Sequence, residues 1–410
     1  MVVNVIRIIA KNHENKPDIR SLGDNLIEDI NNLLINDDVL LVEGAKESSL
    51  DAVLIESGGS EELFLEQLES IRKPFILFST GANNSLAASF EIKTYCMNKK
   101  IFCSFAIGEE EQQAKFIAKS AKAIDSYFKI QNSNLGVIGG RSPWLIANDI
   151  DYKKVKEKFG INLIDITSDE LKSEIDKFEL ENNLPRYKEV LKKYKNKEEV
   201  DKAYNIYSAL KRLVYKYNLS GLTIKCFDLI GEYKTTACLA LALLNDEGIV
   251  SACEGDIPSL ITMYLVYRVT DMPCFMANIS KIGDNFESII LSHCTVPFVL
   301  TDGYSIMTHF ESGLGIAIRG NMPLQDISVV KIGPSFSPKD LLFFVSKINE
   351  NLTLENFCRT QIKVEFQKEN IAQLIKSNFA NHVIVAYSDI SEDFVFLLEL
   401  FYNFDNELFD

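Results

Sequence analysis

The chain has 410 residues, of which 47% are hydrophobic, so it can bury the cores of two or three domains of ordinary size. Its 58 acidic and 43 basic residues give a formal net charge of −15, and such a surface repels nucleic acid and anionic lipid. The longest uncharged apolar run, "TTACLALALL", is far too short to span a membrane, and the eight cysteines lack zinc-site spacing. We therefore expect a cytoplasmic protein with reduced, buried cysteines and with neither nucleic acid nor a membrane as its partner.

The first region of the chain alternates short apolar runs with longer amphipathic stretches. The apolar runs are "NVIRIIA", "DVLLVEG", "DAVLIES", "PFILFS" and "IFCSFAI". The amphipathic stretches include residues 59–71, 83–100 and 109–130. Apolar runs that are each followed by a helix are typical of a parallel sheet covered on both faces. The pattern predicts a doubly wound α/β domain over residues 1–130.

A second region of the same kind begins after the polar linker "QNSN". Its expected strands are "LGVIGG", "INLIDIT", "LTIKCFD" and "GIVSACEG", and its expected helices cover residues 198–218, 235–245 and 259–270. This order predicts a second doubly wound α/β domain over residues 131–270. Ligands of such sheets bind beyond the carboxyl ends of the strands, which is where Glu254 and Asp256 follow an apolar run.

The last region, residues 271–410, has a different pattern. Strand-like pieces dominate it, and they are "PCFMANI", "SIILSHC", "LGIAIRG", "ISVVKIG", "TQIKVEF" and "NHVIVAYSD". Fewer helices separate these pieces, so the pattern predicts a β-rich, barrel-like C-terminal domain.

Three of the four histidines lie in marked contexts, His293 in "LSHCTVP", His309 in "MTHFESGLG" and His382 in "ANHVIVAYSD". Taken singly, each is explained as a partly buried, hydrogen-bonded strand residue. Together with Glu254 and Asp256 they fall at strand ends of neighbouring domains. Carboxylates and imidazoles in such a group are the ligands that a divalent metal uses, so we expect a metal site.

The sequence around these residues resembles the L-fucose isomerase-like proteins, relatives of L-fucose and L-arabinose isomerases. The resemblance rests on "CEGDIPSLITM", "SHCTVP", "HFESGLGIAIRG" and "NHVIVAYSD" and covers most of the chain. It implies two α/β domains followed by a β-barrel domain, and trimers or hexamers in which the first domain of one subunit closes the active site of another. It also implies metal-assisted interconversion of an aldose and a ketose through an enediol, with manganese as the expected metal.

The resemblance assigns roles to four of the residues. Glu254 matches the family's metal-ligating, proton-shuttling glutamate, and His293 and His382 match metal-binding histidines. Asn278 lies where the family has a second carboxylate; an amide oxygen can ligate a metal, but it cannot act as a base. Asp256 is expected to cap the following helix or to supply the second catalytic group.

The remaining candidates are substrate contacts. His309, followed by a Gly-rich turn, is expected either to orient sugar hydroxyls or to serve only as a hairpin-turn residue. Arg141 and Trp144 in "GVIGGRSPW" suit a sugar, because an aromatic face packs on C–H bonds and a guanidinium binds hydroxyls. The same stretch lacks the G-x-G-x-x-G spacing of a nicotinamide site.

The leading functional hypothesis is a metal-dependent sugar isomerase that acts on a small aldose or ketose. Asn278 is the main argument for the alternative, a sugar-binding or regulatory protein that has the isomerase fold but no turnover. A third hypothesis is an enzyme that uses the same glutamate and metal for other carbonyl or aldol-type chemistry.

Overall fold

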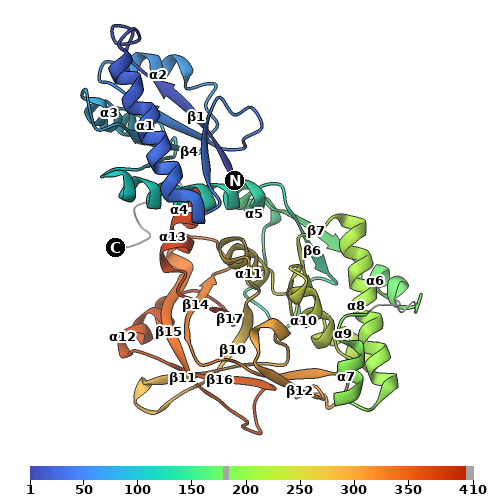
Figure 1. Ribbon diagram of the computed structural model, residues 1–410. Coiled ribbons are helices and arrows are strands. Elements are labelled where there is room, and N and C mark those ends of the chain that lie inside the picture. The colour runs from blue at the N-terminus through green and yellow to red at the C-terminus, as the bar shows by residue number, and fades with distance from the viewer. Residues whose placement is uncertain (179–183, 403–410) are drawn as a thin grey trace. The chain divides into compact units, whose positions relative to one another are not determined.

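The computed structural model describes residues 1–178 and 184–402, and the chain divides into two compact units (Figure 1). Of the described residues, the first unit contains 1–129 and 395–402, and the second contains 130–178 and 184–394. The division into three domains, with a boundary near residue 270, remains a prediction. Within the described ranges, no helix has both the length and the apolar character needed to cross a membrane.

The first unit is built on a five-stranded parallel sheet with the strand order β2-β1-β3-β4-β5. Its strands are β1 (Val2–Ile8), β2 (Leu40–Glu43), β3 (Asp51–Ile55), β4 (Phe75–Ser79) and β5 (Cys103–Phe105). Its helices are α1 (Pro17–Leu33), α2 (Glu61–Gln67), α3 (Ser85–Asn98) and α4 (Glu110–Ile130). A short 3-10 helix, Leu34–Asn36, directly follows α1. Every residue of β3 and β4 is buried, which is why these strands read as continuous apolar runs in the sequence.

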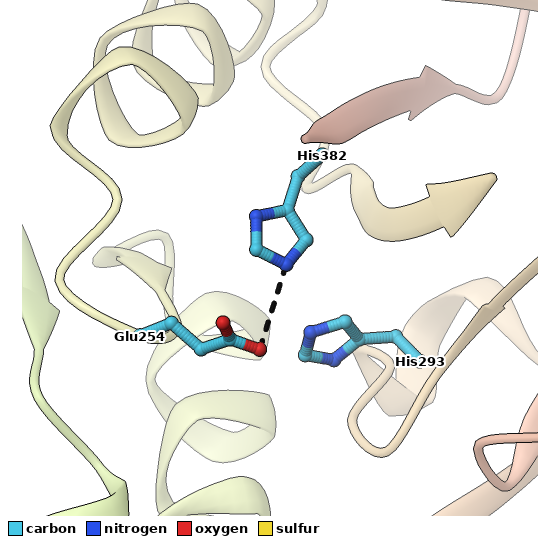
Figure 2. Close-up of side chains that lie close together, drawn as sticks. All are labelled: Glu254, His293 and His382. Atoms are coloured by element: carbon cyan, nitrogen blue, oxygen red, sulfur yellow. Dashed lines mark ion pairs between the residues drawn. The ribbon is translucent and has the colours of Figure 1, made fainter. Parts of the chain in front are cut away.

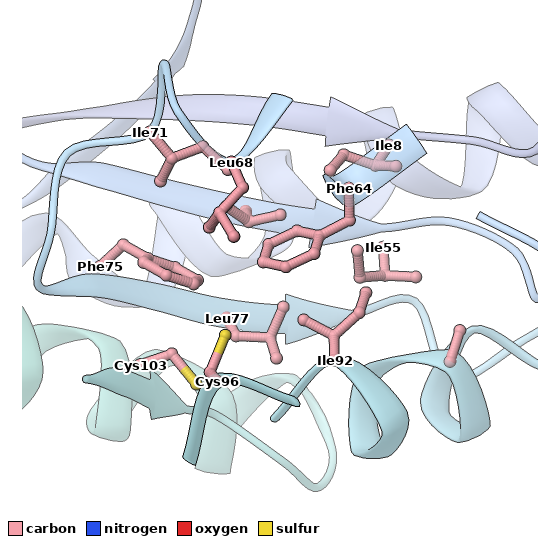
Figure 3. Packing of buried hydrophobic residues seen from close by; sticks show 12 residues of the cluster. Ile8, Ile55, Phe64, Leu68, Ile71, Phe75, Leu77, Ile92, Cys96 and Cys103 are labelled. Atoms are coloured by element: carbon pink, nitrogen blue, oxygen red, sulfur yellow. The ribbon is translucent and has the colours of Figure 1, made fainter. Parts of the chain in front are cut away.

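The core of the first unit packs one face of this sheet against helices α2 and α3 (Figure 3). Phe64 from α2 and Phe75 from β4 are at most 1% exposed, and their ring centroids lie 6.1 Å apart. Ile92 and Cys96 from α3 join the same cluster. Since burying a large apolar side chain contributes roughly 1.5–3 kcal/mol, this cluster is a main source of the unit's stability.

The second unit begins with a four-stranded parallel sheet with the order β7-β6-β8-β9. Its strands are β6 (Asn134–Ile138), β7 (Asn162–Ile166), β8 (Gly221–Ile224) and β9 (Val250–Ala252). Its helices are α5 (Tyr152–Phe159), α6 (Ser168–Ile175), α7 (Tyr187–Lys193), α8 (Lys197–Tyr217), α9 (Phe227–Tyr233), α10 (Cys238–Asp246) and α11 (Ile257–Thr270). The sequence-predicted strand "LTIKCFD" is shorter than expected, because α9 begins at Phe227.

The second unit continues into a closed barrel with the strand order β10-β11-β16-β15-β14-β17, in which the paired strands run antiparallel. The barrel strands are β10 (Phe275–Ile282), β11 (Ser288–His293), β14 (Asp326–Ile332), β15 (Leu341–Asn351), β16 (Thr360–Glu365) and β17 (His382–Ala386). Outside the barrel, this unit has a hairpin of β12 (Gly303–Met307) and β13 (Ala317–Asn321), helix α12 (Lys368–Lys376), and 3-10 helices at Asp284–Phe286, Phe298–Leu300 and Pro338–Asp340. Helix α13 (Ser391–Tyr402) begins in the second unit and continues into the first. The predicted fold class, two parallel-sheet α/β regions and a barrel, is confirmed.

Helix α11 joins the sheet of the second unit to its barrel. It contacts β8 and β9 of the sheet as well as β14 and β17 of the barrel, and its residues from Ile257 to Val266 are all buried. A helix that is covered on all sides needs no charged face, which explains why the stretch "SLITMYLV" is mainly apolar and carries no charge. The amino end of α11 therefore lies where the carboxyl end of β9 meets the barrel.

Candidate active site

Three side chains from distant parts of the sequence converge in the second unit (Figure 2). Glu254 follows β9, His293 is the last residue of β11, and His382 is the first residue of β17. Each offers one ligand atom, and these atoms all lie within 4.8 Å of one another. The predicted grouping of a glutamate and two histidines from the sheet and the barrel is therefore present, and we call it the Glu–His–His cluster.

The backbone at Glu254 adopts an unusual conformation that aims its side chain into this cluster. Glu254 has a φ of 63°, a left-handed value that costs a non-glycine residue about 1–3 kcal/mol. Gly255 follows with a φ of 70°, and a Cβ there would meet the carbonyl oxygen of Gly140 at 2.2 Å. The carbonyl oxygen of Glu254 accepts a hydrogen bond from the Ser142 amide at 3.0 Å, so the loop after β6 holds the turn.

The carboxylate of Glu254 is fixed on one side by Trp144. The Trp144 indole Nε1 donates to Glu254 Oε2 at 2.6 Å, and Glu254 Oε1 lies 3.5 Å from His382 Nε2. Burial by itself raises the pKa of Glu254, but His382, His293 and the Trp144 hydrogen bond outweigh it and lower the pKa to about 2. Glu254 is therefore an ionised carboxylate at neutral pH.

The imidazole of His382 is oriented by Asp256. His382 Nδ1 lies 2.8 Å from Asp256 Oδ2, and both side chains are fully buried. His382 Nε2, on the opposite side of the ring, is buried and has no hydrogen-bond partner. Its nearest charged group is Glu254 Oε1 at 3.5 Å, an ion-pair distance. A histidine whose one nitrogen is held by a carboxylate while the other faces a second potential ligand is the usual arrangement of a metal-binding histidine.

His293 supplies a second imidazole in a neutral state. It is 4% exposed, and burial, together with the charge of His382, lowers the pKa of His293 to about 4. Its Nδ1 is buried without a hydrogen-bond partner, and its ring centroid lies 5.6 Å from that of His382. Neutral imidazole is the form that binds metal, and His293 is already in that form. Burial lowers the pKa of His382, but Asp256 and Glu254 outweigh it and raise that pKa, so a metal at Nε2 would displace a proton. With that exchange, the two imidazoles and the ionised Glu254 fit a borderline divalent cation.

Asp256 contacts His382 of the cluster but does not line the pocket. Its side chain caps α11, because Ser259 N donates to Asp256 Oδ1 at 2.9 Å, and Ser259 Oγ donates to Oδ2 at 2.7 Å. Burial alone raises the pKa of Asp256, but Lys331 and His382 lower it well below its usual range. The structure therefore contains the helix cap that the sequence predicts for Asp256.

Asn278 and His309 line the same pocket as Glu254 and His293. Asn278 lies on β10, directly opposite His382 of β17 on one side and Ser292 of β11 on the other. His309 lies in the β12–β13 turn, where its Nδ1 is 3.1 Å from Ser312 Oγ. It is therefore both a turn residue and a pocket-lining residue.

The loop after β6 carries the two remaining candidates. Trp144 is 48% exposed, and its ring meets Phe227 edge-on, with centroids 4.7 Å apart. Arg141 is exposed and donates from Nη1 to the Leu145 carbonyl at 2.9 Å; it is not among the residues that line the pocket.

Two features of the site are missing from the sequence-based description. Lys331 is buried against Asp256, and the only signal for it is a lysine inside the apolar strand "ISVVKIG". Cysteines also form much of the pocket wall, with Cys226 Sγ and Cys253 Sγ 3.1 Å apart. All eight cysteines are free, as expected, and seven of them are buried.

A partly buried carboxylate and two buried imidazoles, each with a ring nitrogen that has no hydrogen-bond partner, are typical of a metal-dependent enzyme when they lie beside a pocket. No family model matches the chain. Curated proteins similar to it are sulfoquinovose isomerases. The protein from Priestia aryabhattai is 20% identical over 380 residues, which are 86% of this chain and 84% of the relative. The protein from Alkalicoccus urumqiensis is 21% identical over 308 residues, 71% of this chain and 68% of the relative.

A third relative, the sulfoquinovose isomerase from Clostridium sp. (strain MSTE9), is 24% identical over 206 residues, which are 48% of this chain and 45% of the relative. These similarities support membership of a sugar isomerase family. They also bear out the prediction that the chain is an enzyme of the aldose–ketose isomerase class.

Proposed function

We propose that this protein interconverts an aldose and a ketose through an enediol, with a divalent metal, manganese in the first instance, held by Glu254, His293 and His382. The observation that carries the proposal is the buried Nε2 of His382, which has no hydrogen-bond partner and lies at an ion-pair distance of 3.5 Å from the ionised Glu254. A bound divalent metal would hold the two substrate oxygens and stabilise the negative charge that develops on them.

Glu254 is the proposed proton-transfer group. It is the carboxylate of the cluster that also lines the pocket, and Trp144 holds one of its oxygens while the other faces the histidines. A carboxylate fixed at a pocket wall can take a proton from one sugar carbon and return it to the neighbouring carbon. The left-handed backbone at Glu254 is consistent with a side chain held for function.

The other candidates take supporting roles in this proposal. Asn278 supplies an amide that polarises a substrate oxygen or ligates the metal, and it cannot serve as a second base. Asp256 orients His382, since its carboxylate is fully buried and already has four donor atoms around it, on Ser259, Lys331 and His382. His309 orients a substrate hydroxyl, and the exposed Trp144 ring packs against the sugar.

The relatives make sulfoquinovose, a sulfonated sugar, the first substrate to test. A sulfonate needs a cationic partner, yet none of the described residues lining the pocket is a lysine or an arginine. Arg141 lies three residues before Trp144, the residue that binds Glu254, and a guanidinium suits a sulfonate. We propose Arg141 as this partner, in a trimer or hexamer whose neighbouring subunit completes the site.

The test is an assay of ketose formation with sulfoquinovose and with quinovose, the matched sugar without the sulfonate. We expect turnover in the presence of manganese and none after a chelator has removed the metal. In Glu254→Gln the turnover should fall by at least about 100-fold. Equal turnover by Glu254→Gln would contradict the proposal. Sugar binding without any turnover, in manganese-loaded protein, would support the alternative of a binding protein.

A further inference from the structure

A single lysine is buried beside the proposed metal site. Lys331 lies in strand β14 and is 0% exposed, and it is the only buried lysine or arginine within residues 1–178 and 184–402. Its Nζ lies 3.3 Å from Asp256 Oδ2 and 3.4 Å from Oδ1, and it also donates to Ser259 Oγ. An ammonium group is buried only when a charged partner and hydrogen bonds replace its water.

Lys331 belongs to a chain of contacts that ends at the metal site. Asp256 Oδ2 accepts from Lys331 on one side and lies 2.8 Å from His382 Nδ1 on the other. The three groups come from three elements, because Asp256 caps α11, Lys331 lies in β14 and His382 begins β17. Ser259 of α11 supplies the remaining donors to the carboxylate.

The position of β14 against α11 is fixed independently of the charge on Lys331. The next residue, Ile332, donates its backbone N–H to Thr262 Oγ1 at 3.1 Å, and α11 packs against β14. Replacing a buried ion pair by apolar groups is often neutral for stability. Stability alone therefore does not account for a lysine at this position.

We propose that Lys331 is a positioning residue for the metal-binding imidazole of His382 and that it acts through Asp256. This inference rests on the proposed metal site of the Glu–His–His cluster. Lys331 balances the buried charge of Asp256 and fixes the place of its carboxylate. The carboxylate in turn fixes the ring of His382, so that Nε2 faces Glu254. Removal of the ammonium group frees the carboxylate to shift, and the metal loses a preset ligand.

The test is a double-mutant cycle read out as the affinity for Mn²⁺, measured from the signal of free Mn²⁺ in electron paramagnetic resonance. The variants are Lys331→Met, Asp256→Asn and the double variant, and no substrate is present. Loss of a group that orients a metal ligand costs about 10–100-fold in affinity, and we expect this from each single variant. The double variant should bind no more weakly than Asp256→Asn alone, since Lys331 acts only through Asp256.

The matched control is Lys347→Met, which removes an exposed lysine from the neighbouring strand β15 and should leave the affinity unchanged. Thermal unfolding of each variant separates the two roles, because a purely structural role lowers the unfolding temperature without changing Mn²⁺ affinity in the folded protein. Lys331→Met leaves the Asp256 carboxylate buried without its ammonium partner, so this variant is the one most exposed to misfolding. If it does not fold, Asp256→Asn and the double variant still test the inference, because neither contains that carboxylate. They should bind Mn²⁺ equally.

Unchanged affinity in folded Lys331→Met, or losses that multiply in the double variant, would overturn the role of Lys331 and leave the proposed function intact. A wild-type protein that binds no Mn²⁺ at the Glu–His–His cluster would overturn both.

Discussion

Two buried clusters, one in each unit, contain different chemistry. The cluster around Phe64 and Phe75 in the first unit is made of apolar side chains, whereas the second unit buries Asp256, Lys331 and His382 together at the start of α11. Apolar burial stabilises a fold in proportion to its area, while buried charges must recover their lost hydration from one another. The apolar core thus holds its unit together, and the charged cluster is explained by what its groups orient. Substitutions in the two places should therefore change different properties.

The largest effect on stability is expected from Phe64→Ala in the first unit. Removing a fully buried aromatic ring from a packed core costs about 3–5 kcal/mol of unfolding free energy. Hydrogen exchange of the β3 and β4 amides measures this loss, and Mn²⁺ affinity should stay at the wild-type value. The control is Phe90→Ala, which removes a 49% exposed ring and should cost about 1 kcal/mol. Equal costs would contradict the account of the core.

His382→Ala is expected to weaken metal binding rather than to destabilise the fold. It removes a proposed ligand, so Mn²⁺ affinity should fall about 100-fold or more, which corresponds to about 2.7 kcal/mol. Calorimetric titration measures the change, and His309→Ala, which alters a pocket histidine outside the cluster, should stay within about threefold of wild type. If His309→Ala lost as much affinity as His382→Ala, the ligand set would be wrong.

Asn278→Asp should tighten metal binding. The new carboxylate adds an anion on β10, opposite His382, and a tenfold gain in Mn²⁺ affinity, about 1.4 kcal/mol, is the expected size. The same titration measures it. A weaker site in Asn278→Asp would show that Asn278 does not face the metal.

The smallest effect is expected from Arg141→Gln, because this guanidinium is exposed and solvent weakens its pairing. The kcat/KM for sulfoquinovose should fall about fivefold, and the value for quinovose should stay unchanged. A matching fall for both sugars would remove Arg141 from sulfonate recognition.

The sequence was sufficient to predict the fold class and the members of the cluster. Continuous apolar runs follow from strands buried on both faces, as in β3 and β4, and these runs are visible without a structure. Glu254, His293 and His382 could be named because they combine strand ends with the family resemblance, and the structure brings their ligand atoms together.

Other features depend on contacts between distant residues, which sequence patterns do not contain. The long strand β15 is absent from the predicted strands, because "LLFFVSKINEN" mixes an apolar run with polar residues rather than alternating. The Trp144 bond to Glu254 spans 110 residues, and the Lys331 contact with Asp256 spans 75. The first pairing requires the assembled parallel sheet, because the two residues follow β6 and β9, and the second requires α11 packed against the barrel.

The central claim, that Glu254 moves a proton between adjacent sugar carbons, is tested most directly by hydrogen exchange with solvent. Manganese-loaded protein is incubated with sulfoquinovose or quinovose in deuterated water, and deuterium at the carbon next to the carbonyl is followed together with ketose formation. The account predicts exchange and ketose formation by the wild type, and a fall of at least about 100-fold in both for Glu254→Gln. Exchange by Glu254→Gln at the wild-type rate would contradict it.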